Sequence, residues 1–189
     1  MAVEANLSGG DDFTEVFDLI DARDRVIGRV LRGEAHRNPA LWHRSVQVLI
    51  FAFDGRLLLQ RRSSTKDLFP GYFCASASGH VAAGESYDST AEREVREELG
   101  VTLPLTYLDK RIVKSRMETE MTTLYVGRSD GPFTFHPTET AGGVFLTLEE
   151  IQTGRAEDSL PMTPALLCAL DVLAELRRPG KLDVLLAAL

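Results

Sequence analysis

Cysteine is scarce in this sequence, and long apolar runs are absent. Cys74 and Cys168 are the two cysteines among 189 residues, too few for a disulfide framework, so we expect free thiols in a reducing compartment. The first residues lack the basic stretch and apolar run of a secretory signal. No segment approaches the roughly 20 apolar residues of a membrane span. These absences predict a cytoplasmic protein that does not enter a membrane.

An excess of basic residues is also missing. The chain has 21 Lys and Arg against 28 Asp and Glu, a net charge of −7. This balance argues against binding to a nucleic-acid polymer, but it permits a small phosphorylated substrate held by a few cationic side chains. The length suits one domain. We expect a flexible tail at 1–12, where Ser, Gly and Asp cluster, and a single domain at 13–189.

The apolar pattern predicts an α+β domain with a mixed β-sheet. The apolar run 46–53 is typical of a strand buried on both faces, and Asp54-Gly55 predicts a tight turn into a returning strand at 56–62. The linker 34–45 is expected to be irregular. Other extended segments are expected at 15–21 paired with 26–33, and at 74–78, 103–115, 121–128 and 143–148. Helices are expected at 86–100, 163–178 and 181–189, with one helical turn at 148–153.

The helix expected between Ser86 and Gly100 has an apolar face with acids at its edge. Ser86 is a favoured N-cap residue type and Gly100 a favoured C-terminal one. Because successive residues turn by about 100°, four apolar side chains share one face: Tyr87, Ala91, Val95 and Leu99. Glu94 and Glu98 are four residues apart and therefore lie one above the other, with Glu97 beside Glu94.

Carboxylates gathered beside a buried face need cations. Like charges at this spacing cost about 0.2–0.5 kcal/mol in an isolated helix, and a merely solvated acidic face would lie opposite the apolar stripe. Hard divalent ions such as Mg²⁺ take oxygen ligands. Arg93 is four residues before Glu97 and is expected to pair with it, while Glu85 adds an oxygen from the preceding loop. The pattern predicts a metal-binding helix.

The stretch from Gly79 to Val101 resembles the Nudix box at every defined position. Gly79 is followed after five residues by Glu85, and after seven more by the run Arg93-Glu94-Val95-Arg96-Glu97-Glu98-Leu99-Gly100-Val101. The resemblance implies a loop–helix–loop motif on an α/β/α sandwich. It also implies hydrolysis of a phosphoanhydride in a nucleoside diphosphate linked to another group, with Mg²⁺ or Mn²⁺.

The same resemblance assigns roles to the acids. Glu94 and Glu98 would be direct metal ligands, joined by the backbone carbonyl of Gly79. Glu97 would be a further ligand or would orient the attacking water. An acid outside the box often serves as the base in this family, and the candidates are Glu118, Glu120 and the less favoured Glu139. Glu85 would support the site, and we expect catalytic roles for Arg93, Glu97, Glu98 and Glu120.

The flanking sequence is similar to a narrower branch, which contains type I isopentenyl diphosphate isomerase, over residues 15–128. The similar segments are FDLIDARDRVIGRVLRGEAHR, WHRSVQVLIF, LLLQRRSSTKDLFPG and SGHVAAGES. The resemblance implies a second metal site of three His and two Glu, at His36, His43, His80, Glu118 and Glu120. Such a set suits Mn²⁺ or Zn²⁺; the alternative is that these residues are retained structurally. A grip on the diphosphate would come from Arg62, Lys66 and Arg32.

Two departures distinguish this chain from the isomerases. Their catalytic cysteine falls on Ser78, a far weaker acid than a thiol, and Cys74 is four residues away. The isomerases usually lose the acidic pattern of the helix, which is intact here. We therefore expect a Nudix hydrolase that acts on a small nucleotide or diphosphate. The alternatives are an isopentenyl diphosphate isomerase and a nucleotide-binding sensor without catalysis. Homodimers are frequent in the family.

Overall fold

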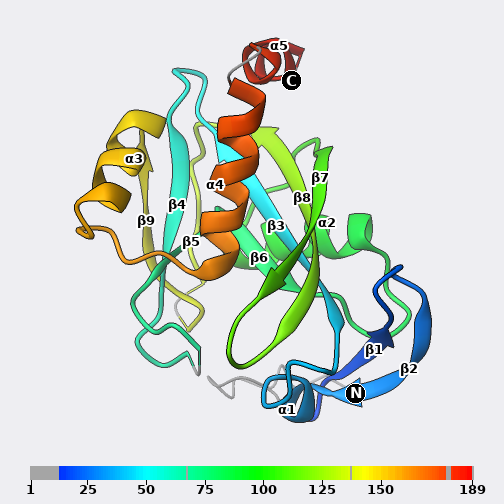
Figure 1. The fold of residues 1–189 in the computed structure, drawn as a ribbon. Helices are drawn as coiled ribbons and strands as arrows, with labels where there is room; N and C mark the ends of the chain where they lie inside the picture. Colours follow the sequence, from blue (N-terminus) through cyan, green and yellow to red (C-terminus); the bar gives the residue numbers. More distant parts are fainter. Residues whose placement is uncertain (1–12, 67, 137, 178–179, 189) are drawn as a thin grey trace, which may run out of the picture.

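Helices cover both faces of a mixed β-sheet (Figure 1), in a computed structural model that describes residues 13–66, 68–136, 138–177 and 180–188. This arrangement confirms the predicted α+β class. The tail expected at 1–12 lies outside the described residues. Within the described ranges, no helix is both long and apolar enough to span a membrane.

The elements follow one another with short connections. The strands are β1 Val16–Ile20, β2 Val26–Leu31, β3 His43–Phe51, β4 Leu57–Arg62, β5 Phe73–Cys74, β6 Ala77–His80, β7 Thr106–Lys114, β8 Thr119–Arg128 and β9 Thr140–Leu146. The helices are α1 Arg32–Ala35, α2 Tyr87–Leu99, α3 Leu148–Ala156, α4 Pro164–Arg177 and α5 Lys181–Ala188.

Strand β3 lies at the centre of the main sheet. The strand order is β5-β4-β3-β8-β7, with β6 also paired to β3 and β9 to β4. The β3–β8 pair is parallel, and the other pairs are antiparallel. The apolar residues of Val46–Phe51 in β3 are completely buried and Gln47 is 3% exposed, as the nearly continuous apolar run predicts. The parallel pairing places His43 of β3 opposite Glu120 of β8, which bears directly on the site described below.

The two faces of this sheet are covered by different helices. Leu49 and Phe51 of β3 belong to a core cluster that includes the apolar residues of α4, which lies in front of the sheet in Figure 1. Val46, Val48 and Ile50 point to the other face and pack with the apolar stripe of α2. The alternation of side chains along a strand explains this division. It leaves α2 anchored by its apolar stripe with its acids at the edge of the core.

Two sequence expectations need correction. The linker 34–45 is not wholly irregular, because it contains part of α1 and the first residues of β3. Ala35 of α1 is fully buried beside Phe17 and Val30, so tertiary packing rather than periodicity forms this one-turn helix. The single turn expected at 148–153 is the longer helix α3, capped by Thr147, whose hydroxyl accepts a hydrogen bond from the Glu150 backbone N–H. The pairing of β1 with β2 is confirmed.

The turn between β1 and β2 is fixed to the sheet and to α2 through Asp24. Its carboxylate accepts hydrogen bonds from Arg44 Nε at 2.6 Å, Lys110 Nζ at 2.7 Å and the Tyr87 hydroxyl at 3.1 Å. The Lys110 ammonium also lies 4.1 Å from the centre of the Tyr87 ring. Burial opposes ionisation, but the hydrogen bonds from Lys110 and Arg44 hold the pKa of Asp24 below its usual value.

We expect Asp24→Asn to lower the free energy of unfolding by about 1–3 kcal/mol at pH 7, since two cations lose their shared anion. A depressed carboxyl pKa stabilises the fold above the unfolded-state pKa, near 3.9, and this contribution disappears as pH falls through the lower folded value. The difference from wild type should therefore persist from pH 7 to about pH 4 and shrink below it. Urea unfolding across this range measures it. Asp158→Asn is the matched control, because Asp158 is exposed and has a positive φ of 54°, close to the φ of 61° at Asp24.

Candidate active site

A cavity of about 460 Å³ is lined by members of both groups of residues that the sequence singles out. One group comes from α2, and the other comes from the end of α1, from β6 and from the residues at the start of β8. The acids that line the cavity are Glu15, Glu94, Glu97, Glu98, Glu118, Glu120 and Glu139, and the bases are Arg32, His36, Arg62, Lys66, His80, Arg93 and His136. The structure therefore joins the two predicted sites in one space.

Helix α2 begins and ends as the sequence predicts. The Ser86 hydroxyl accepts a hydrogen bond from the Ser89 backbone N–H, and Gly100 ends the helix in the left-handed conformation with φ of 69°. Glu94 is 9% exposed, whereas Glu97 has an exposed side chain. The helix thus presents one nearly buried acid and one solvated acid to the same cavity.

The backbone of β6 holds the two inner carboxylates. A Cβ atom on Gly79 would overlap the Glu94 carboxylate, so only glycine lets that side chain approach the strand. Glu98 Oε2 accepts hydrogen bonds from the Ser78 backbone N–H at 3.2 Å and from Gln60 Nε2 at 2.9 Å. Gln60 was not identified from the sequence, because no local pattern on β4 indicates that its side chain contacts Glu98.

Arg93 connects the acids of the motif. Its guanidinium donates to both carboxylate oxygens of Glu85 at 3.1 Å, to Glu94 Oε1 at 2.7 Å and to Glu97 Oε2 at 3.1 Å. It also donates to the backbone carbonyl of His80 at 3.3 Å. The ion pair expected between Arg93 and Glu97 is confirmed. One cation thereby orients three acids and attaches the helix to β6.

Arg93 does not fully compensate the negative charges of the two inner carboxylates, Glu94 and Glu98. Burial raises the pKa of Glu94 to about 7, against the opposing effect of Arg93 and with a contribution from Glu97. Burial, and then the charges of Glu94 and Glu139, hold the pKa of Glu98 well above its usual range. Buried oxygen ligands whose ionised forms are this costly fit a hard divalent cation, which would remove the penalty.

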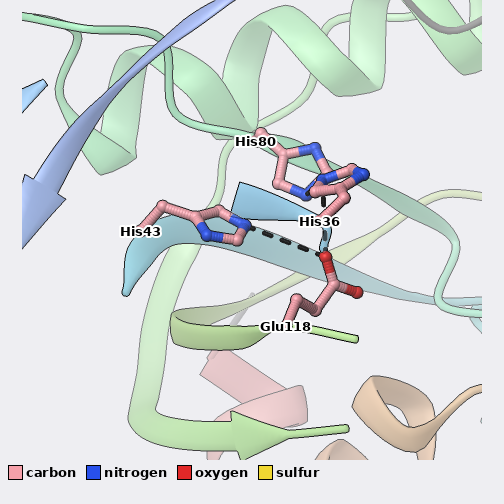
Figure 2. Close-up of side chains that lie close together, drawn as sticks. All are labelled: His36, His43, His80 and Glu118. Carbon is pink, nitrogen blue, oxygen red and sulfur yellow. Dashed lines mark hydrogen bonds and ion pairs between the residues drawn. The ribbon is translucent and has the colours of Figure 1, made fainter. Parts of the chain in front are cut away.

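The three predicted histidines converge with Glu118 (Figure 2), and one ligand atom from each of the four residues lies within 4.8 Å of the others. His36 Nε2 is 3.3 Å from His80 Nε2 and 3.4 Å from Glu118 Oε2. His43 Nε2 is 3.9 Å from Glu118 Oε2, and Glu120 Oε1 is 3.4 Å from His80 Nε2. All five residues expected for a second metal site therefore lie together.

His43 is prepared to act as a ligand. Its Nδ1 lies 3.4 Å from the Leu41 carbonyl, which can only accept, so Nδ1 carries the proton and Nε2 presents a lone pair. This buried Nε2 atom has no hydrogen-bond partner among the described residues. Phe17, which the sequence analysis did not identify, stacks on His43 at 5.0 Å and on His80 at 4.8 Å between ring centres.

His43 and His80 are held in the neutral form. Burial lowers the pKa of His43. Burial and the neighbouring charge of Arg32 hold the pKa of His80 well below its usual value. Arg32 Nη1 lies 3.3 Å from His80 Nδ1, which must accept because a guanidinium only donates. Neutral His80 therefore carries its proton on Nε2 and would release it on binding a metal through that atom. A mixed imidazole and carboxylate set in this state fits Mn²⁺ or Zn²⁺.

The three cations expected to bind phosphate all line the cavity, and each is positioned by a neighbour. Arg32 pairs with Glu15 at 3.2 Å, and Arg62 Nε donates to the Leu68 carbonyl at 3.0 Å. Lys66 Nζ contacts Glu139 Oε2 at 2.7 Å. Glu139 thus lies at the cavity wall, although it was the least favoured of the candidate bases.

Ser78 and Cys74 both line the cavity. Cys74 is nearly buried on β5, and its Sγ lies 3.7 Å from the Gln60 carbonyl. Burial raises the pKa of the Cys74 thiol to about 12, so the thiolate is negligible at neutral pH. Neither residue provides a thiolate beside the acids.

Comparison with known proteins agrees with this geometry. The family model described as the NUDIX domain matches residues 41–166. The chain belongs to the Nudix family. The matched span includes α2 and most of the cavity, and it begins just before β3. The domain match and relatives named Nudix hydrolase show that this chain is a Nudix hydrolase. Because Nudix hydrolases use divalent metals and act on small molecules, the cavity is the candidate active site.

The relatives of this Nudix hydrolase include proteins named as hydrolases and a protein named as an isomerase. A Nudix hydrolase of Deinococcus radiodurans is 35% identical over 143 residues, covering 72% of this chain and 81% of its own. An isopentenyl-diphosphate Delta-isomerase of Nocardia farcinica is 32% identical over 161 residues, covering 82% of this chain and 92% of its own. The crystal structure of DR0079 from Deinococcus radiodurans superposes with a TM-score of 0.67 at 33% identity, covering 79% of this chain and 93% of that one.

Proposed function

We propose that this Nudix hydrolase cleaves the phosphoanhydride of a nucleoside di- or triphosphate, or of a related diphosphate, by attack of water in the presence of Mg²⁺ or Mn²⁺. The observation that carries the proposal is the pair of inner carboxylates, buried Glu94 and half-buried Glu98, gathered against the backbone of Gly79 and Ser78. A cation held there would screen the diphosphate and lower the pKa of the attacking water.

The residues of the chain divide the remaining tasks. Glu94, Glu98 and the Gly79 carbonyl would hold the cation, with Glu97 at its solvent side. Arg93 acts as a positioning residue, because its contacts are to the acids and to the His80 carbonyl. Basic side chains around the cavity would bind the diphosphate oxygens by charge-assisted hydrogen bonds: Arg32, Arg62 and Lys66. Glu120 is our choice for the base.

The test is a screen of nucleoside diphosphates and triphosphates with Mg²⁺ or Mn²⁺, measuring release of phosphate or pyrophosphate. Activity that needs the metal and disappears in a chelator supports the proposal. Absence of turnover with measurable nucleotide binding would instead support a sensor.

The second candidate is isopentenyl diphosphate isomerisation, and the histidine cluster together with the Nocardia farcinica relative favours it. The intact acids of α2 and the serine at position 78 favour hydrolysis. Incubation with isopentenyl diphosphate distinguishes the two: an isomerase forms the dimethylallyl isomer, whereas a hydrolase does not.

We also propose that the cluster of His36, His43, His80, Glu118 and Glu120 holds its own cation. We expect His43→Gln to lower the affinity for Mn²⁺ or Zn²⁺ at this cluster by at least about 100-fold, since it removes the imidazole whose lone pair is already presented. Metal titration by calorimetry measures the change. His136→Gln is the control, because His136 is exposed and lies outside the cluster. Equal affinity in wild type and His43→Gln would show that the cluster is structural.

A further inference from the structure

Gln47 is a buried amide whose hydrogen-bonding capacity the protein does not use. Gln47 is one of the residues that line the cavity, and it is 3% exposed. Neither Nε2 nor Oε1 has a hydrogen-bond partner among the described residues. Burying an amide unpaired is costly, and most buried polar groups are satisfied. Gln47 therefore requires an explanation that the metal sites and the phosphate-binding cations do not supply.

A second glutamine in the same cavity shows what a structural role looks like. Gln60 is 2% exposed, and its Nε2 donates to the Ser76 carbonyl at 2.5 Å and to Glu98 Oε2 at 2.9 Å. Gln60 thereby positions a member of the acidic pair. The Gln47 amide makes no hydrogen bond to such a group among the described residues, so the two glutamines differ in function although they share burial and a cavity.

The strand register places Gln47 beside both sites. On β3 it follows His43 and Ser45 on the same side of the strand, and its partner on β6 is Ser78, whose backbone N–H binds Glu98. A substrate whose diphosphate lies between the acids and the cations would therefore bring its organic group within reach of this strand. The apolar part of the lining is suited to such a group: Leu68, Phe69, Val113, Pro164 and Ala165.

A carboxamide offers one acceptor and one donor side by side, so it matches an organic group that presents the complementary pair. The edge of a nucleobase does so, and glutamine pairs with adenine in this way in nucleic-acid recognition. A hydrocarbon chain would leave both amide atoms unpaired. We propose that Gln47 is a specificity-determining residue, which selects diphosphates bearing a heterocyclic base over those bearing a hydrocarbon. This inference rests on the proposed hydrolytic function.

The experiment compares kcat/KM for ADP, CDP, GDP and UDP with kcat/KM for isopentenyl diphosphate, all measured as Mg²⁺-dependent phosphate release. Wild type should prefer at least one nucleotide. In Gln47→Leu the ratio of that nucleotide to isopentenyl diphosphate should fall about 10- to 100-fold, the effect of one or two lost hydrogen bonds in a buried site. Gln47→Met, which keeps the length of the side chain, should give the same fall. Gln152→Leu on the exposed side of α3 should leave the ratio unchanged.

A thermal melt without substrate separates recognition from folding. Replacing an unpaired buried amide by an apolar side chain is neutral or stabilising, so the midpoints of Gln47→Leu and Gln47→Met should not fall below that of wild type. A lower midpoint in both variants would overturn the inference, because it would show that the amide supports the fold.

The outcomes distinguish this inference from the proposed function. Wild type that hydrolyses isopentenyl diphosphate as well as every nucleotide, or an unchanged ratio in Gln47→Leu, overturns the specificity role while hydrolysis stands. If wild type hydrolyses none of these diphosphates and no nucleoside triphosphate, the proposed function fails, and nucleotide binding decides the role of Gln47. With Ca²⁺ present, a nucleoside diphosphate should then raise the midpoint of wild type but not of Gln47→Leu; equal shifts in both would overturn the inference.

Discussion

Glu98→Gln should reduce metal-dependent hydrolysis by about 10³-fold. A bound cation supplies several kcal/mol of charge stabilisation in the transition state, and each 1.36 kcal/mol corresponds to a factor of ten in rate. The substitution removes the negative charge but keeps an oxygen that can accept from Ser78 N–H and Gln60 Nε2, the two donors to the native carboxylate. The measurement is phosphate release at saturating Mg²⁺ on a substrate that wild type hydrolyses.

The stability of the same variant should change in the opposite direction. Burial and the charge of Glu94 raise the pKa of Glu98, so the ionised carboxylate destabilises the metal-free protein at neutral pH. Glu98→Gln should melt at the same temperature as wild type or higher without metal, and it should lose the rise that Mg²⁺ gives to wild type. Glu92→Gln, an exposed acid of the same helix, is the control. Full Mg²⁺-dependent activity in Glu98→Gln would refute the assignment of this acid.

Local signals made the motif helix predictable from the sequence. Ser86 and Gly100 act within a few residues of the helix ends, and the apolar stripe of α2 is a property of its own spacing. The same locality explains the failure at α1, whose single turn depends on Ala35 packing against a strand distant in the chain. The apolar pattern of the sequence therefore does not predict helices and strands whose boundaries depend on tertiary contacts.

The cavity shows the same division between local and distant causes. His43 and Glu120 face each other because β3 and β8 pair in parallel across more than seventy residues of chain, and no local pattern specifies that register. Only the resemblance to the isomerase branch grouped these residues in advance. Gln47 had no such guide. Its position within an apolar strand predicts burial, but the lack of a partner for its amide emerges only when the surrounding strands are in place.

Gly79→Ala should lower metal affinity and activity by about 10- to 100-fold, the loss typical when a group that orients a ligand is disturbed. A Cβ atom at this position would overlap the carboxylate of Glu94. The obstructed atoms are the end of a flexible side chain, so we expect the fold to survive while the carboxylate turns away from β6. Calorimetric Mn²⁺ titration and phosphate release measure the two losses.

Gly28→Ala tests whether any such loss is specific to the site. Gly28 also lies in a strand, but the nearest atom to an added Cβ there is Leu19 Cδ2, at the ordinary contact distance of 3.8 Å. Both substitutions reduce the freedom of the unfolded backbone alike, so a difference in metal binding must arise from Glu94. If Gly79→Ala binds Mn²⁺ as wild type does, the close approach of Glu94 to β6 is not what holds the cation. If both variants lose binding equally, the effect lies in the strands rather than in the site.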